Sequence, residues 1–226
     1  MSPGRARRPA GDPVELVLVR HAQTPSNVRH ALDTLPPGPG LTELGHAQAE
    51  ALADGFDGTE VGSVFTSQLT RTRLTAAPLL ARRRLEPLVR DGLAEVRAGQ
   101  YEMRTDRGAI EAYLSTIFRW SAGDLGAALP GGESGARVLE RFDGVVEEAV
   151  GTGHPRVVLV SHGAAIRVWA AARVHNVTPE MARTTALRNA CAIVVRGRPG
   201  QGWTMTRWDE QPPLVQVPDS AMELGR

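Results

Sequence analysis

Short apolar runs alternate along the chain with segments in which apolar residues recur at helical spacing. The runs typical of buried strands cover residues 15–19, 61–66, 85–89, 157–160, 190–195 and 204–208. Helical patterns begin at Thr42 and Ser67 and cover residues 105–150 and 164–174, the former broken by Gly123 and by 130–132. This alternation predicts an α/β fold. We expect a three-layer α/β/α sandwich, with helices on both faces of a mostly parallel central sheet.

Two hydroxyl residues stand where helices are expected to begin. Thr42 precedes a segment whose apolar positions share one face, and its hydroxyl is predicted to cap that helix. Ser67 is predicted to cap the following helix in the same way. The expected buried face of the first helix consists of Leu44, Ala47, Ala51 and Leu52.

The ends of the chain lack the pattern of regular structure. We expect a disordered segment over residues 1–13 and, because of its prolines, an extended tail over 209–226. Residues 14–208 are predicted to form a single domain, in which about 100–130 form a helical cap over the site. No apolar run reaches the roughly 18 residues of a membrane-spanning helix, and residues 1–13 lack the apolar core of a signal peptide. These features predict a cytoplasmic protein.

Composition excludes several kinds of chemistry. All 26 basic residues are Arg, and the absence of Lys excludes a Walker loop, a kinase lysine and a Schiff-base lysine. A phosphate group bound by side-chain charge must therefore be bound by Arg, whose guanidinium offers paired donors. The net charge of +1 predicts neither a nucleic-acid partner nor a membrane partner. Cys191 stands alone, which excludes an internal disulfide and a Cys-based zinc site.

Two strand ends share one pattern. The runs 16–19 and 157–160 are each followed by a polar residue, a His and a small residue, so that His21 and His162 occupy matching positions. Ligands of open α/β sheets bind outside the carboxyl ends of the strands. If the two strands are parallel neighbours, both imidazoles face one crevice, where Ala22 and Gly163 let backbone N–H groups approach an anion. The sequence has no pair of His at i, i+4 spacing and no HExxH motif, so we expect no metal.

Five groups of residues, in order, resemble the signatures of the histidine phosphatase superfamily, the phosphoglycerate-mutase-like enzymes. The segment from Arg20 to Asn27 is similar to the Arg-His-Gly-x-Thr-x-x-Asn motif, although Ala22 replaces the usual Gly. The other similar segments are 41–49, 67–76, Leu93-Ala94-Glu95 with Gly99, and Pro130–Ser134 together with Ser161-His162-Gly163. The resemblance covers residues 14 to about 165.

The resemblance implies a role for each of seven residues. His21 would attack a phosphoryl group and carry it as a phosphohistidine, and Glu95 would protonate the leaving oxygen and then activate water. His162 would complete the catalytic pocket. The phosphoryl oxygens would be bound by Arg20, Arg71, Asn27 and Gly163. This chemistry needs no metal and no cofactor, because fixed guanidinium groups stabilise the developing charge.

The resemblance therefore predicts a metal-independent phosphatase that acts on a small phosphorylated metabolite. One alternative is a cofactor-dependent phosphoglycerate mutase, which returns the phosphoryl group to a substrate. Another is a non-catalytic phosphate-binding protein, which the replacement at Ala22 favours. A homodimer is possible on this sequence. Four further residues are candidates for the substrate cleft: Arg29, His30, Arg104 and Trp120.

Overall fold

The central sheet has six strands in the order β3-β2-β4-β1-β5-β6. A computed structural model describes residues 7, 9, 11–198, 200–209 and 211. β1 (Val14–Arg20) pairs in parallel with β4 (Arg156–Ser161), β4 with β2 (Ser63–Thr66), and β2 with β3 (Leu88–Val89). β5 (Ala192–Arg198) runs antiparallel to β1 and to β6 (Gly202–Trp208). The predicted mostly parallel sheet is confirmed.

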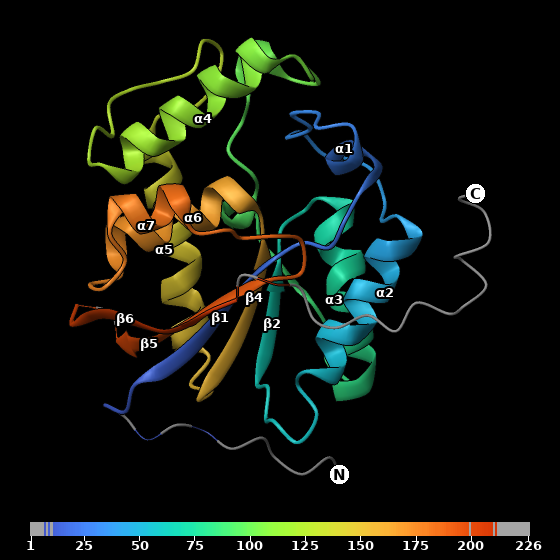
Figure 1. Cartoon of the computed structure of the whole chain (residues 1–226). Coiled ribbons are helices and arrows are strands. Elements are labelled where there is room, and N and C mark those ends of the chain that lie inside the picture. The colour runs from blue at the N-terminus through green and yellow to red at the C-terminus, as the bar shows by residue number, and fades with distance from the viewer. Residues whose placement is uncertain (1–6, 8, 10, 199, 210, 212–226) are drawn as a thin grey trace.

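Helices cover both faces of this sheet (Figure 1). α2 (Glu43–Asp54) and α3 (Thr70–Arg83) lie on one face. α5 (Gly135–Gly151), α6 (Gly163–Arg173) and the short α7 (Pro179–Thr184) lie on the other face. Above the carboxyl ends of the parallel strands lie α1 (Pro25–Val28) and α4 (Arg107–Ser121). The three-layer arrangement expected from the sequence is therefore present.

Strict alternation along β1 and β4 explains the two cores. Leu16 and Leu18 of β1 pack in the core beneath α5 and α6, whereas Val17 and Val19 pack in the core beneath α2 and α3. β4 divides its apolar residues in the same way. Because successive side chains of a strand point to opposite faces, a continuous apolar run is what a strand covered on both faces requires.

Three local predictions fail. α3 begins at Thr70 with Leu69 as its cap residue, so Ser67 does not cap it; the Ser67 hydroxyl instead accepts a hydrogen bond from Leu69 N at 3.2 Å. Residues 85–87 are not part of β3, because Leu85 N still bonds to Leu80 O at the end of α3. On α2 the prediction of a Thr42 cap is confirmed, but the predicted buried face is wrong. Leu44 is 40% exposed, and the buried residues are Gly45, Gln48, Ala49, Leu52 and Ala53.

The ends of the chain are described only in part. The predicted disordered segment 1–13 and extended tail 209–226 lie largely outside the described residues. Within the described part of the chain, no helix has the length and apolar character needed to cross a membrane.

Candidate active site

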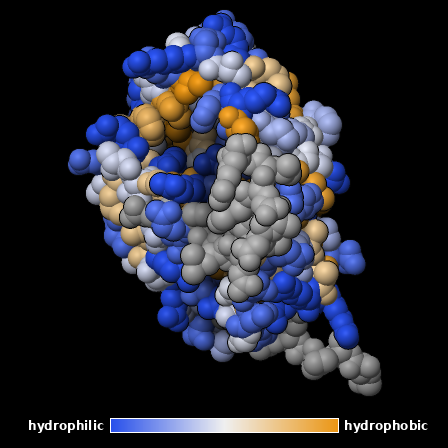
Figure 2. Space-filling view, turned by 45° about the vertical axis from the view of Figure 1, so that its right-hand side comes forward, coloured by the Kyte–Doolittle hydropathy of each residue, from blue (hydrophilic) through white to orange (hydrophobic). Residues whose placement is uncertain are grey.

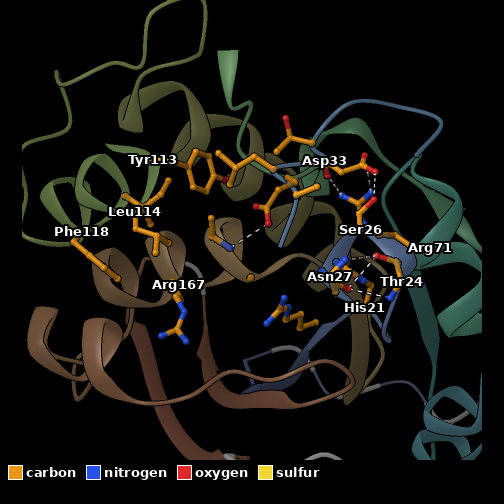
Figure 3. A pocket seen from close by; sticks show the side chains of 18 residues that line it. His21, Thr24, Ser26, Asn27, Asp33, Arg71, Tyr113, Leu114, Phe118 and Arg167 are labelled. Carbon is orange, nitrogen blue, oxygen red and sulfur yellow. Dashed lines mark hydrogen bonds and ion pairs between the residues drawn. The ribbon is translucent and has the colours of Figure 1, made fainter. Parts of the chain in front are cut away.

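A cavity of about 280 Å³ opens where β1 and β4 end, between α4 on one side and α1 with the loop 29–34 on the other (Figure 3). Figure 2 shows a hollow with hydrophilic residues inside and hydrophobic residues along its upper edge. β1 and β4 pair in register up to Arg20 and Ser161, so the residues that follow them come together at one edge of the sheet. The rings of His21 and His162 lie 5.2 Å apart between centroids, inclined by 58°. The two imidazoles are neighbours, as predicted, but only His21 lines the cavity, so the prediction that both face one crevice is wrong for His162.

His21 lies at the bottom of this cavity and is 4% exposed. Its Nδ1 lies 2.8 Å from the carbonyl oxygen of Ala22, and because a carbonyl only accepts, Nδ1 carries the proton. Nε2 therefore holds the lone pair, and it has no hydrogen-bond partner among the described residues. Burial, with the positive charges of Arg71 and Arg20, lowers the pKa of His21 well below its ordinary 6.5. The imidazole is neutral and nucleophilic at neutral pH.

Two buried guanidinium groups face the same cavity. Arg20, the last residue of β1, donates from Nη1 to Leu187 O at 2.8 Å, while its Nε is buried without a partner. Arg71 lies in the first turn of α3 and donates from Nη2 to Asp33 O at 2.9 Å. Its Nη1 lies 3.7 Å from Asp33 Oδ1 and makes no hydrogen bond. Burial lowers the pKa of both arginines below the ordinary 12.5, yet a guanidinium stays charged at neutral pH. Such cations with unpaired N–H groups suit an anion.

His162 is fully buried behind these groups rather than on the cavity surface. Its Nδ1 accepts a hydrogen bond from Arg71 Nε at 3.3 Å, so the proton lies on Nε2, which donates to Ser67 Oγ at 2.9 Å. Ser67 Oγ in turn lies 2.9 Å from Thr72 Oγ1. Burial, followed by the charge of Arg71, lowers the pKa of His162 well below 6.5. In this arrangement His162 is neutral and acts on the cavity through Arg71.

Glu95 lines the cavity from the loop that follows β3. Its Oε1 accepts from Val96 N at 2.9 Å and from Ala165 N at 3.0 Å, and its Oε2 accepts from Ala164 N at 3.3 Å. The side chain of His162, the cap residue of α6, makes no capping bond, so Glu95 satisfies the N-terminus of that helix. Gly163, the first residue of α6, also lines the cavity. A Cβ at that position would lie 3.4 Å from Arg20 Nε, so the small residue leaves room for the guanidinium.

α4 supplies an apolar wall on the open side of the cavity. Tyr113, Leu114, Ile117 and Phe118 all line it (Figure 3). The Tyr113 hydroxyl donates to Val96 O at 3.0 Å, and burial raises the pKa of that hydroxyl well above its ordinary 10. Tyr113 therefore presents its ring to the cavity and is no candidate for proton transfer.

Asn27 lines the cavity from α1, as predicted for a phosphate ligand. Its Oδ1 accepts from Thr24 N at 3.0 Å and from Asn189 Nδ2 at 3.0 Å. These bonds orient the amide so that its Nδ2 is the free group. Thr24 is the cap residue of α1 and forms a capping box with Asn27. The capping box of α1 and the bond from Asn189 together fix the orientation of this amide.

Other candidates from the sequence lie away from the cavity. Arg29, His30 and Arg104 are exposed and do not line it, and Arg104 pairs with Asp106 at 2.6 Å. Trp120 is 1% exposed and donates to Ala127 O at 2.7 Å, so it belongs to the core. Ala22 lies outside the left-handed backbone region, which means that its Cβ causes no strain.

Three residues at the site carry no recognisable signal in the sequence. Arg167 lies one turn beyond Gly163 on α6 and lines the cavity; burial, with a contribution from Arg20, lowers its pKa to about 10. Asn189 donates to the carbonyl oxygen of His21 at 2.9 Å as well as to Asn27. Asp33 binds Arg71 and accepts from Ser26 Oγ at 2.6 Å. Each comes from a segment without a motif, and only folding brings it to the cavity.

The described residues contain no group of three or more His, Cys, Asp or Glu side chains that could hold a metal ion. The donors around the cavity are instead arginine, amide and backbone N–H groups. These donors suit a phosphoryl group directly.

Comparison with known proteins identifies the family. A model of the histidine phosphatase superfamily (branch 1) matches residues 16–211. The chain therefore belongs to this superfamily, as the motifs predicted. Its site residues fall within the matched region.

Individual relatives agree with this assignment. The chain is 34% identical over 219 residues to PE-PGRS family protein PE_PGRS11 of Mycobacterium tuberculosis, a match that covers 89% of the chain but 37% of that longer protein. It is 33% identical over 156 residues to phosphoserine phosphatase 1 of Hydrogenobacter thermophilus, covering 68% of the chain and 73% of the relative. The solved structure of a mycobacterial glucosyl-3-phosphoglycerate phosphatase with VO3 is 27% identical, has a TM-score of 0.72, and is matched over 90% of this chain and 98% of that one. The second and third of these proteins are named as phosphatases, whereas the name of the first states no activity.

Proposed function

We propose that this protein hydrolyses small phosphomonoesters through a covalent phosphohistidine on His21, without a metal ion. One observation carries the proposal: the free Nε2 of His21 shares a cavity with Arg20 and Arg71, each of which has a buried N–H without a partner. A neutral nucleophile and cations with unpaired N–H groups are what attack on a phosphoryl dianion requires.

In the first step, Nε2 of His21 attacks phosphorus and the bond from phosphorus to the ester oxygen breaks. Arg20, Arg71 and the Asn27 amide stabilise the charge on the other three phosphoryl oxygens. Glu95 gives a proton to the departing oxygen. Oε2 is the atom suited to carry this proton, because it accepts one hydrogen bond, at 3.3 Å, whereas Oε1 accepts two shorter ones, at 2.9 and 3.0 Å.

In the second step, water attacks the phosphohistidine. The Glu95 carboxylate takes a proton from this water, the bond from phosphorus to nitrogen breaks, and the electron pair returns to Nε2 of His21. Inorganic phosphate leaves and the starting protonation states are restored. His162 takes no proton in either step and serves to hold Arg71 in place.

The cavity walls favour an ester whose alcohol has an apolar part. α4 presents apolar side chains, and the hydroxyl groups opposite are already used: Ser26 donates to Asp33, and Thr34 donates to Glu102. A polyhydroxylated alcohol would find few free partners there, and burying unpaired hydroxyl groups is costly. Arg167 remains as a cation for an additional acidic group.

The decisive experiment compares the wild type with His21→Ala in a chelating buffer. We expect the wild type to hydrolyse 4-nitrophenyl phosphate equally well with and without EDTA, and His21→Ala to be inactive while still binding phosphate. Transfer of the phosphoryl group to an added phosphoglycerate instead of water would favour a mutase. Phosphate binding without turnover by the wild type would favour a binding protein.

A further inference from the structure

Arg141 of α5 binds the loop that carries Glu95, and every N–H of its guanidinium is used. Nη1 donates to Gly92 O at 2.8 Å and to Ala94 O at 2.7 Å. Nη2 donates to Glu95 O at 3.4 Å and to Glu133 Oε1 at 2.8 Å, and Nε donates to Glu133 Oε2 at 3.0 Å. Three carbonyl oxygens of the loop, those of Gly92, Ala94 and Glu95, thus bind to one planar group.

The bond to Glu133 is unlike the surface ion pairs of this protein. The side chains of Arg141 and Glu133 are 16% and 14% exposed, whereas those of Arg137 and Glu140, on the same helix, are 67% and 68% exposed. Glu133 Oε1 also accepts from Arg97 N at 3.3 Å. The pair therefore holds the loop on both sides of Glu95. An ion pair largely removed from water adds little net stability, so we attribute its role to the geometry that it fixes.

The loop lies directly against α5 at this point. A Cβ at Gly92 would lie 2.3 Å from Arg141 O, so only glycine permits the approach. On its other side the Glu95 carboxylate accepts from the first turn of α6. The backbone of Glu95 is thus fixed by α5 and its carboxylate by α6, which leaves the acid little freedom to move.

We propose that Arg141 and Glu133 form a positioning pair that places the Glu95 carboxyl for proton transfer to the leaving oxygen. Neither residue lines the cavity that holds His21; both line a second cavity, to which Glu95 also belongs. The inference rests on the proposed function, since it concerns the proton donor of that reaction. Its consequence is specific: loss of the pair impairs the first step, formation of the phosphohistidine, only as far as the leaving group needs a proton.

The test uses two esters that differ in this need. The alkoxide of an alkyl phosphate must be protonated as it leaves, whereas 2,4-dinitrophenolate leaves without help. General acid catalysis contributes on the order of 10²- to 10⁴-fold, and we expect Arg141→Gln to lower kcat/KM, which reports only the step up to release of the alcohol, for phenethyl phosphate by about 30-fold or more. For 2,4-dinitrophenyl phosphate the decrease should be under about threefold. Arg137→Gln, four residues earlier on α5, is the matched control and should leave both rates unchanged.

Two further variants separate positioning from a general loss of structure. Glu133→Gln keeps the size of the side chain but removes its charge and replaces one acceptor of Arg141 by an N–H donor, and it should give the same selective loss even if Arg141→Gln folds poorly. In a Glu95→Gln background, Arg141→Gln should cost no additional activity towards the alkyl ester. Equal losses for both esters, or additive losses in the double variant, would overturn the positioning role alone. A wild type that hydrolyses neither ester would overturn the proposed function and this inference with it.

Discussion

Arg71 donates a hydrogen bond from Nε to Nδ1 of His162 at 3.3 Å, and this contact fixes both residues. The guanidinium can only donate, so Nδ1 of His162 is unprotonated and the imidazole is neutral. The other two nitrogens of Arg71 are then directed differently: Nη2 bonds to the backbone of Asp33, and Nη1 is left without a hydrogen bond. His162 thus orients Arg71, and Arg71 provides the cavity with a free donor at Nη1.

The first prediction concerns this free donor. Arg71→Met should lower kcat/KM for 4-nitrophenyl phosphate about a hundredfold, or about 3 kcal/mol of barrier, because one stabilising donor set is lost. Arg73→Met serves as the control, since Arg73 is exposed two residues further along α3. Steady-state kinetics of both variants measure the difference. Equal effects at the two positions would contradict the role of Arg71.

The second prediction concerns stability against acid. Because the pKa of His21 is lowered in the folded protein, the unfolded chain binds a proton below pH 6.5 that the folded protein does not. The contribution of His21 to the free energy of unfolding should therefore be fully present above pH 6.5. It should fall as the pH decreases below that value, by up to about 1.4 kcal/mol per pH unit. In urea unfolding, the free energy of unfolding of His21→Asn should change less between pH 6.5 and 5 than that of the wild type. His30→Asn, at an exposed position, should behave as the wild type.

The third prediction concerns the wall of the cavity. Leu114→Asn should lower kcat/KM for 1-naphthyl phosphate about tenfold, because roughly 50 Å² of apolar contact is worth somewhat over 1 kcal/mol. Inhibition by inorganic phosphate should not change, since phosphate does not reach α4. Leu44→Asn is matched in exposure, as both leucines are 40% exposed, but Leu44 lies outside the cavity. A loss in both variants would show that the effect is not one of substrate contact.

The sequence predicts the parts of the fold that depend on local pattern. The runs at β1 and β4 are continuous and apolar because both faces of the sheet are covered, and this signal places His21 beside His162 correctly. The cap at Thr42 is correct for a similar reason, since a capping bond involves residues only three apart.

Predictions fail where distant contacts decide the structure. Ser67 resembles a helix cap, yet its hydroxyl bonds to His162, 95 residues away. Glu133 directly precedes Ser134, the cap residue of α5, yet its carboxylate binds Arg141, eight residues away. Arg167 reaches the cavity because it lies one turn beyond Gly163 and Ala164 on α6, and these two residues also line the cavity. No local pattern encodes such partners, so only the folded structure identifies them.

The most direct test of the account is detection of the phosphorylated residue. Glu95→Gln should still be phosphorylated by 2,4-dinitrophenyl phosphate but should release phosphate slowly, because water is no longer activated. After an alkaline quench, which preserves phosphohistidine, trypsin cleaves after Arg20 and Arg29 and yields a peptide in which His21 is the only histidine. We predict that mass spectrometry finds the phosphoryl group on this peptide and that acid removes it. Turnover with no phosphoryl group on residues 21–29, or an acid-stable phosphoryl group elsewhere, would contradict the mechanism.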